Sequence, residues 1–241
     1  MAPPFDTLLD AIAERSAVMR SAATDLEARV PGCPDWSVRD LLVHVGQVQL
    51  SWAAKVHALG AEAPGVEEVP TGDPLAWSEA STGILVDALR DVGPDAPCWT
   101  WWQDSPAPST SGAVARHQVQ EAAVHAYDAQ SATGAARDLP VDVAVDAVDE
   151  FLVVSLGAME AWQPWPHPPE RVEVVAVEGP RWTVGLGAVV DDAGRPDATM
   201  TASASDLVLA FYSRIPLQRI DVEGDRDVVE RLLAWASAST D

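Results

Sequence analysis

Three residues of this chain, His44, Glu121 and His125, have the types and spacing of a metal site. Glu121 and His125 are four positions apart in a segment with helical periodicity, so their side chains share one face of a helix. His44 comes from a separate segment that is also expected to be helical. Two imidazoles and one carboxylate leave a fourth position open on a tetrahedral ion such as zinc, which is typical of catalytic sites. The residues alone therefore make the chain a candidate metalloenzyme.

A single helix cannot supply the whole site. His117 precedes Glu121 by four positions, but His117 and His125 are separated by about 12 Å along a helix axis. Ligand bonds of about 2.0–2.2 Å do not span that distance, so the third ligand must come from another helix of a bundle. His117 is then a supporting group or a surface residue. Asp128, three residues past His125, either orients that imidazole or is an exposed acid.

The alternative to a metal site is three unrelated polar residues. A histidine among apolar neighbours is more often a hydrogen-bonded core residue than a ligand, and Glu-x-x-x-His arises by chance in many helices. Periodicity leaves both interpretations open.

The elements that must position these residues are helices over the first two thirds of the chain. Ser37 is placed to cap the helix that carries His44, and Asp40 completes a capping-box variant. Gly134 is placed to end the helix that carries Glu121 and His125. Apolar spacing and turn residues predict five helices, over residues 5–29, 38–59, 74–91, 111–132 and 140–161.

Beyond a proline-rich stretch near residue 165 the pattern changes to alternation typical of strands. Strands are expected over 171–177, 181–190, 198–204 and 217–222, and helices over 206–213 and 226–235. We therefore predict an α+β chain with a helical bundle over residues 1–162 and a small α+β domain over 163–241.

The charge and the apolar pattern exclude several classes of partner. The net charge of −22, from 37 acidic and 15 basic residues, repels nucleic acid and anionic membrane. No apolar stretch approaches the roughly 20 residues of a membrane span, and no secretory signal is visible, so a cytoplasmic location is expected. Cys33 and Cys98 do not form a disulfide framework. Either a monomer or a homodimer fits the composition.

Tryptophan gathers in a long segment, residues 92–112, that is expected to be a loop. Trp99, Trp101 and Trp102 either cover a substrate pocket or pack a seam between the two domains. The sequence does not choose between these roles.

Residues 30–46, with Pro34, a Trp36-Ser37-Val38 run and His44-Val45-Gly46, resemble the first block of the mycothiol-dependent maleylpyruvate isomerase family. Residues 116–129 resemble its second block, in which an arginine precedes Glu-x-x-x-His-x-x-Asp. Residues 204–214 and 222–225 resemble its C-terminal sterol-carrier-like domain. The resemblance covers nearly the whole chain in the same order.

This resemblance implies a DinB-like bundle in which His44, Glu121 and His125 hold zinc or another divalent metal. It implies mycothiol as the thiol cosubstrate, a small-molecule electrophile as its partner, and Arg214 as an anion-binding residue of the catalytic site. Ser213 and the pair Phe211-Tyr212 depart from the family's usual glycine and aliphatic-tryptophan pair, which puts the substrate end in doubt.

The implied chemistry begins with a thiolate that adds to an electrophilic carbon. Addition to a cis double bond followed by elimination would make the chain an isomerase, and displacement of a leaving group would make it an S-transferase. Two alternatives need no thiol chemistry: a metal-binding protein, and a non-catalytic protein that binds a small molecule.

Overall fold

In a computed structural model that describes residues 3–67, 69–103, 105–187 and 194–238, the chain divides into two compact units. Unit 1 comprises Met1–Gln103 and Pro108–Leu139, and unit 2 comprises Asp104–Ala107 and Pro140–Asp241. Among the helices of the described residues, none has the length and apolar character needed to cross a bilayer.

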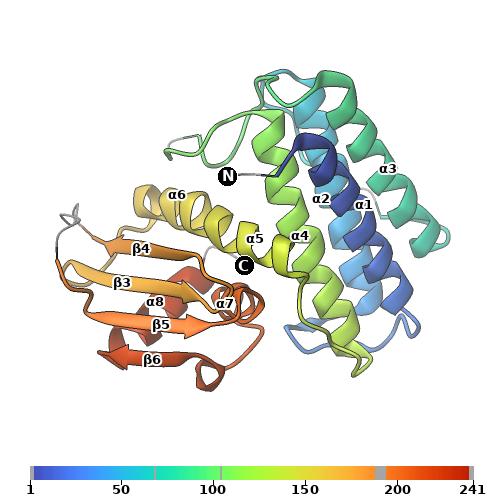
Figure 1. Ribbon diagram of the computed structural model, residues 1–241. Helices are drawn as coiled ribbons and strands as arrows, with labels where there is room; N and C mark the ends of the chain where they lie inside the picture. The colour runs from blue at the N-terminus through green and yellow to red at the C-terminus, as the bar shows by residue number, and fades with distance from the viewer. Residues whose placement is uncertain (1–2, 68, 104, 188–193, 239–241) are drawn as a thin grey trace. The chain divides into compact units, whose positions relative to one another are not determined.

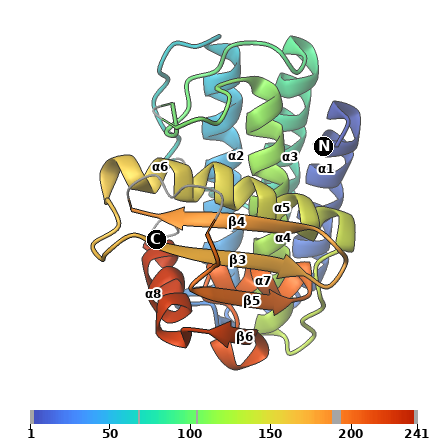
Figure 2. The ribbon, with the colours of Figure 1, turned by 60° about the vertical axis from the view of Figure 1, so that its left-hand side comes forward.

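Unit 1 is a bundle of four helices, which lie alongside one another in Figures 1 and 2. Helix α1 packs mainly against α4, and α2 mainly against α3. Apolar residues of α1, α2 and α4 share one buried cluster, which includes Met19, Leu41, Val45, Ala126 and Ala129. The predicted N-terminal helical bundle is confirmed. Its helices are α1 (Phe5–Ala22), α2 (Val38–His57), α3 (Pro74–Val92) and α4 (Ser111–Ala132).

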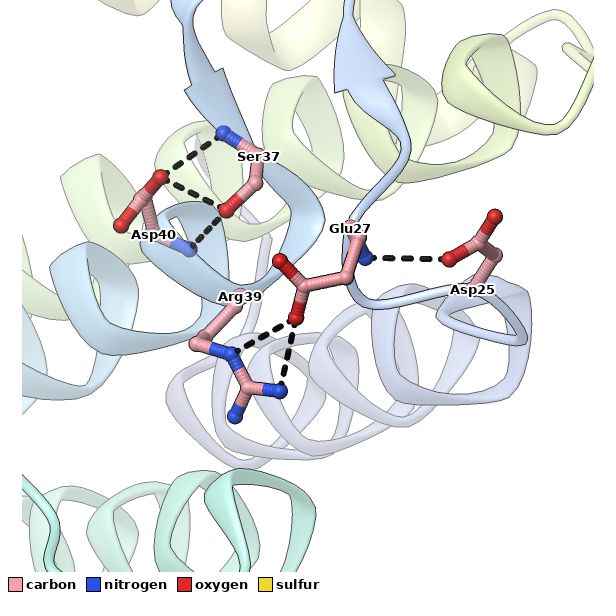
Figure 3. Close-up of polar contacts among 5 residues, drawn as sticks. All are labelled: Asp25, Glu27, Ser37, Arg39 and Asp40. Atoms are coloured by element: carbon pink, nitrogen blue, oxygen red, sulfur yellow. Dashed lines mark hydrogen bonds and ion pairs between the residues drawn. The ribbon is translucent and has the colours of Figure 1, made fainter.

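The start of α2 is fixed by the predicted capping box (Figure 3). The Ser37 backbone N–H donates to Asp40 Oδ2 at 2.8 Å, and the Asp40 backbone N–H donates to Ser37 Oγ at 3.2 Å. Two N–H groups that a helix start leaves without partners are thereby satisfied. Because α2 begins at Val38, His44 lies in its second turn.

A short hairpin precedes α2, which the sequence did not predict. The first helix ends at Ala22 rather than at residue 29, and Asp25 turns the chain by accepting from the Glu27 backbone N–H at 3.0 Å (Figure 3). Strands β1 (Arg29–Val30) and β2 (Cys33–Ser37) then pair antiparallel. The hairpin places Trp36 directly before the helix that carries His44.

Unit 2 combines a four-stranded sheet with helices, which confirms the predicted α+β class (Figure 2). The strand order is β4-β3-β5-β6, with β3 and β5 parallel and the outer pairs antiparallel. Helix α8 packs against β3, β5 and β6. The last residues of the strand expected over 181–190 lie outside the described part of the chain. The elements are α5 (Val141–Val153), α6 (Ser155–Trp162), β3 (Glu170–Ala176), β4 (Arg181–Leu186), β5 (Ala198–Ala202), α7 (Ala204–Phe211), a 3-10 turn (Leu217–Arg219), β6 (Asp221–Gly224) and α8 (Arg226–Ser237).

The division between the units differs from the boundary predicted at residue 162. The helix expected over 140–161 is split at Val154 into α5 and α6, and both belong to unit 2. The Phe151 ring of α5 stacks on the Phe211 ring of α7 with centroids 4.9 Å apart. Trp182 Nε1 of β4 donates to Asp149 Oδ1 at 3.0 Å. Helical periodicity shows that a segment has an apolar face, but it does not show which core that face covers.

Candidate metal centre

The structure brings His44, Glu121 and His125 together inside unit 1. One donor atom from each residue lies within 4.8 Å of the other two, and this is the one such group found among the described residues. Glu121 Oε1 lies 3.4 Å from His44 Nε2 and 3.3 Å from His125 Nε2. Helix α2 supplies the first residue and α4 the other two, so the cluster lies where these helices face each other.

The two Glu121 distances fit a shared metal ion better than they fit hydrogen bonds. Ligand bonds of about 2.0–2.1 Å at a tetrahedral angle place two donor atoms about 3.3 Å apart. Hydrogen bonds between an imidazolium and a carboxylate are shorter, about 2.7–2.9 Å. The observed 3.3 and 3.4 Å separations therefore match the edges of a coordination tetrahedron. A ligand set of two nitrogens and one oxygen suits zinc and several other divalent transition metals.

Asp128 supports the His125 imidazole from the other side. Its Oδ2 lies 3.0 Å from His125 Nδ1, and Asp128 is fully buried. A carboxylate only accepts hydrogen bonds, so Nδ1 donates and Nε2 is left to face Glu121. Carboxylates of this kind fix the tautomer and orientation of ligating histidines. Of the two roles considered for Asp128, the structure shows the orienting one.

Burial and charge act together on these side chains. Burial alone would lower the pKa of His125, but the Glu121 and Asp128 carboxylates outweigh it and raise that pKa to about 9. Burial alone would raise the pKa of Glu121, but its two histidine neighbours hold it well below its ordinary value. Without a metal, the cluster is therefore a carboxylate beside a protonated imidazole. A metal ion that replaces the proton on His125 Nε2 would be attracted by the negative charges of both Glu121 and Asp128.

Aromatic and small residues surround the cluster. The Trp36 ring lies over His44 with centroids 4.6 Å apart, and 6.4 Å from the His125 ring. The sequence indicated Trp36 only as part of the run that resembles the family's first block. Two residues past His44, a Cβ added at Gly46 would lie 2.0 Å from the Trp77 ring of α3. A side chain at position 46 would thus push α3 away from the helix that holds His44.

His117 lies one turn before Glu121 on α4 and takes no part in the ligand cluster. Its ring packs instead against Trp52, Trp101 and Trp102, with centroids 6.0, 5.7 and 5.1 Å away. Trp101 and Trp102 therefore pack within unit 1, on the helices that build the candidate centre.

The protein's own buried thiol is not a nucleophile at neutral pH. Burial raises the pKa of Cys98 to about 11, so the thiol stays protonated. Cys33 packs beside the buried cluster of the bundle.

Arg214, the predicted anion-binding residue, lies in unit 2 just after α7. Its Nη1 donates to the Tyr212 carbonyl at 2.7 Å, and its guanidinium lies 5.9 Å from the Tyr212 ring centroid. Ser213, between them, has a φ of 57°, which favours glycine. The anion-binding role of Arg214 stays a prediction.

Comparison with known proteins points to one family. The family model for the N-terminal domain of mycothiol maleylpyruvate isomerase matches residues 8–130. Crystal structures of the mycothiol-dependent maleylpyruvate isomerase and of a mutant of it each align over 92% of this chain and 93% of their own, with a TM-score of 0.62 and 13% identity. At that identity the likeness shows the fold alone. Curated proteins yield no match.

Proposed function

This chain belongs to the family of the mycothiol maleylpyruvate isomerase N-terminal domain, and we propose that it is a metal-dependent enzyme that uses mycothiol to isomerise a small electrophile. The observation that carries the proposal is the grouping of one donor atom each from His44, Glu121 and His125 within 4.8 Å of one another, inside a bundle of this family. The proposed substrate class is a cis-unsaturated acid of the maleylpyruvate type.

We propose His44, Glu121 and His125 as the ligands of zinc or another divalent metal. Three protein ligands leave a fourth position for the thiol. When bound, a divalent metal lowers the pKa of a coordinating thiol so that the thiolate prevails at neutral pH.

The protein side chains hold the ligating groups in place. Asp128 keeps His125 Nε2 facing Glu121, and the Trp36 indole packs against the His44 imidazole. The thiolate sulfur forms a bond to one carbon of the cis double bond, and the π electrons move onto the conjugated carbonyl oxygen. Rotation about the resulting single bond and return of the electrons break the carbon–sulfur bond. The thiolate leaves unchanged, so no other reactant is consumed.

S-transfer is the second candidate, because it begins with the same thiolate. There the carbon–sulfur bond stays and a leaving group departs with the electron pair. Arg214 is proposed to bind a substrate anion in either case, and Arg214→Ala should raise KM while the metal content stays constant.

The first test is metal content by elemental analysis of untagged protein, with His44→Ala beside it. About one zinc per chain, lost in the variant, is the expected result. His57→Ala is the matched control, because His57 is an exposed histidine of the same helix. Metal retained by His44→Ala, or absent from wild type even after zinc is supplied, would overturn the ligand assignment.

The second test adds mycothiol. Maleylpyruvate converted to its trans isomer with no net loss of thiol supports the isomerase, whereas stoichiometric loss of thiol to an electrophile supports the transferase. A protein that holds one zinc but catalyses neither reaction would be a metal-binding protein without thiol chemistry.

A further inference from the structure

Four aromatic rings form a second cluster in unit 1 that the proposed ligand set does not use. The aromatic cluster consists of Trp52 of α2, Trp101 and Trp102 of the segment before α4, and His117 of α4. Trp102 lies at the middle, with its ring centroid 5.4, 5.1 and 5.1 Å from those of Trp52, Trp101 and His117. Rings at such distances pack on one another in tilted and edge-to-face pairs.

The aromatic cluster lies next to the candidate metal centre. His117 is four residues before Glu121, one helical turn or about 6 Å along α4. Trp52 is eight residues after His44, about 12 Å along α2. Because His44 meets His125 while Trp52 meets His117, the two helices run antiparallel here. The two clusters thus follow one another along the surface that α2 and α4 share. They are separated by about 6 Å along α4 and about 12 Å along α2.

Two rings of the cluster are buried, and the other two are partly accessible. Trp102 is fully buried and its Nε1 donates to the Pro108 carbonyl at 3.1 Å, and Trp52 is buried beside it. Trp101 and His117 are half-buried. At the flank, Lys55 Nζ lies 5.4 Å from the Trp52 centroid and 5.6 Å from that of Trp99, which ties the tryptophan segment to α2. The buried pair, Trp52 and Trp102, thus holds the two accessible rings, Trp101 and His117, in place for a flat ligand.

We propose that the aromatic cluster is the subsite for the flat, electron-poor π-system of the electrophile. The proposal rests on the proposed function for the thiolate that the electrophile meets. Indole rings carry negative charge on their faces. Among the carbons that thiolates attack, those of conjugated carbonyls and nitroarenes belong to π-systems that are depleted of electrons and stack well on such faces. The substrate class is therefore conjugated and planar, and saturated alkyl electrophiles fit poorly.

A binding experiment tests the subsite without any reaction. The probes are 4-nitrobenzamide, which is flat and electron-poor, and trans-4-nitrocyclohexanecarboxamide, its counterpart with a saturated ring. Each is titrated calorimetrically into full-length protein with and without zinc. We expect the flat probe to bind at least tenfold more tightly. Trp101→Leu should weaken its binding about tenfold, whereas Trp101→Phe retains a ring and most of the affinity. Trp162→Leu, which removes an exposed tryptophan of unit 2, is the control.

Equal affinity for the two probes, or unchanged binding by Trp101→Leu, would overturn the subsite. If Trp101→Leu fails to fold by circular dichroism, His117→Leu removes the other half-buried ring and takes its place. Since neither zinc nor thiol is needed, this result stands apart from the metal-content test, and failure of either one leaves the other intact.

The steady-state kinetics of zinc-loaded enzyme with mycothiol give a second test of the aromatic cluster as a subsite. With 1-chloro-2,4-dinitrobenzene, sulfur bonds to the ring carbon and chloride leaves with the electron pair. Trp101→Leu should raise KM for this substrate about tenfold and change kcat less, while iodoacetamide, which has no ring, stays within twofold. An equal loss with both electrophiles would refute a role in recognising the flat group.

Discussion

Asp128→Asn should weaken zinc binding without removing a ligand. Asp128 Oδ2 lies 3.0 Å from His125 Nδ1, and the asparagine amide can still accept that hydrogen bond. What is lost is the negative charge, which the ring width and a ligand bond of about 2.0–2.1 Å place roughly 7 Å from an ion on Nε2. Glu121 neutralises one of the ion's two charges. At an effective dielectric constant of about 20, the remaining unit charge interacts with the carboxylate by about 2 kcal/mol, or about thirtyfold in affinity.

The assay is competition with a chelator of known zinc affinity at two pH values. At pH 9.5, above the His125 pKa of about 9, only about a quarter of the imidazole is protonated, so proton competition is weak and nearly the full effect should appear. At pH 7 the difference should narrow, because Asp128 also stabilises the protonated imidazole that zinc must displace. Asp87→Asn is the control, an equal charge change at an exposed position of α3. Zinc affinity of Asp128→Asn within twofold of this control at pH 9.5 would refute the reasoning.

Three further predictions concern stability. Gly46→Ala should lower the free energy of unfolding in urea by about 1–3 kcal/mol, because the added Cβ meets the Trp77 ring. Gly83→Ala, in open space on α3, should be neutral or stabilising. Equal effects of the two substitutions would contradict the close approach at Gly46. Ser37→Ala should lower the free energy of unfolding by about 1 kcal/mol through loss of the cap, and an unchanged denaturation midpoint would show that the cap contributes nothing. In metal-free protein, the raised pKa of His125 stabilises the fold fully below about pH 6.5, and on the order of 3 kcal/mol is lost as the pH rises to about 9. Urea titrations at pH 6 and 9 should show this loss in wild type and a smaller one in His125→Gln.

Local signals predicted the helices that hold the site. Ser37 and Asp40 form the expected box, and α4 has the predicted bounds of residues 111–132 because Thr110 caps its start and Gly134, with a φ of 69°, follows its end. The hairpin before α2 escaped prediction because a two-residue strand has no alternation to detect. Val154, where α5 gives way to α6, carries no proline or glycine signal.

The candidate site was predictable in composition but not in arrangement. Spacing placed Glu121 and His125 on one face, yet only the packing of α2 on α4 brings His44 within 3.4 Å of Glu121. The ring contacts of Trp36 and Trp52 were not predicted for the same reason, since they join segments that are distant in sequence. Periodicity describes one element at a time, and a site shared by two elements depends on which of their faces meet.

The donor atoms of the candidate centre come from helices far apart in the chain, and this affects how the bundle opens. A metal ion on His44, Glu121 and His125 must be released before α2 and α4 can separate, so it joins them into one opening unit. At a metal concentration a thousand times the Kd, the opening free energy rises by about 4 kcal/mol. When metal is added, amide hydrogen exchange should then slow in α2 and α4 together. Exchange at the ends of α3 should be the same with and without metal. The exchange rates of the α2 amides would therefore report whether metal is bound, although α2 contributes only His44 to the centre.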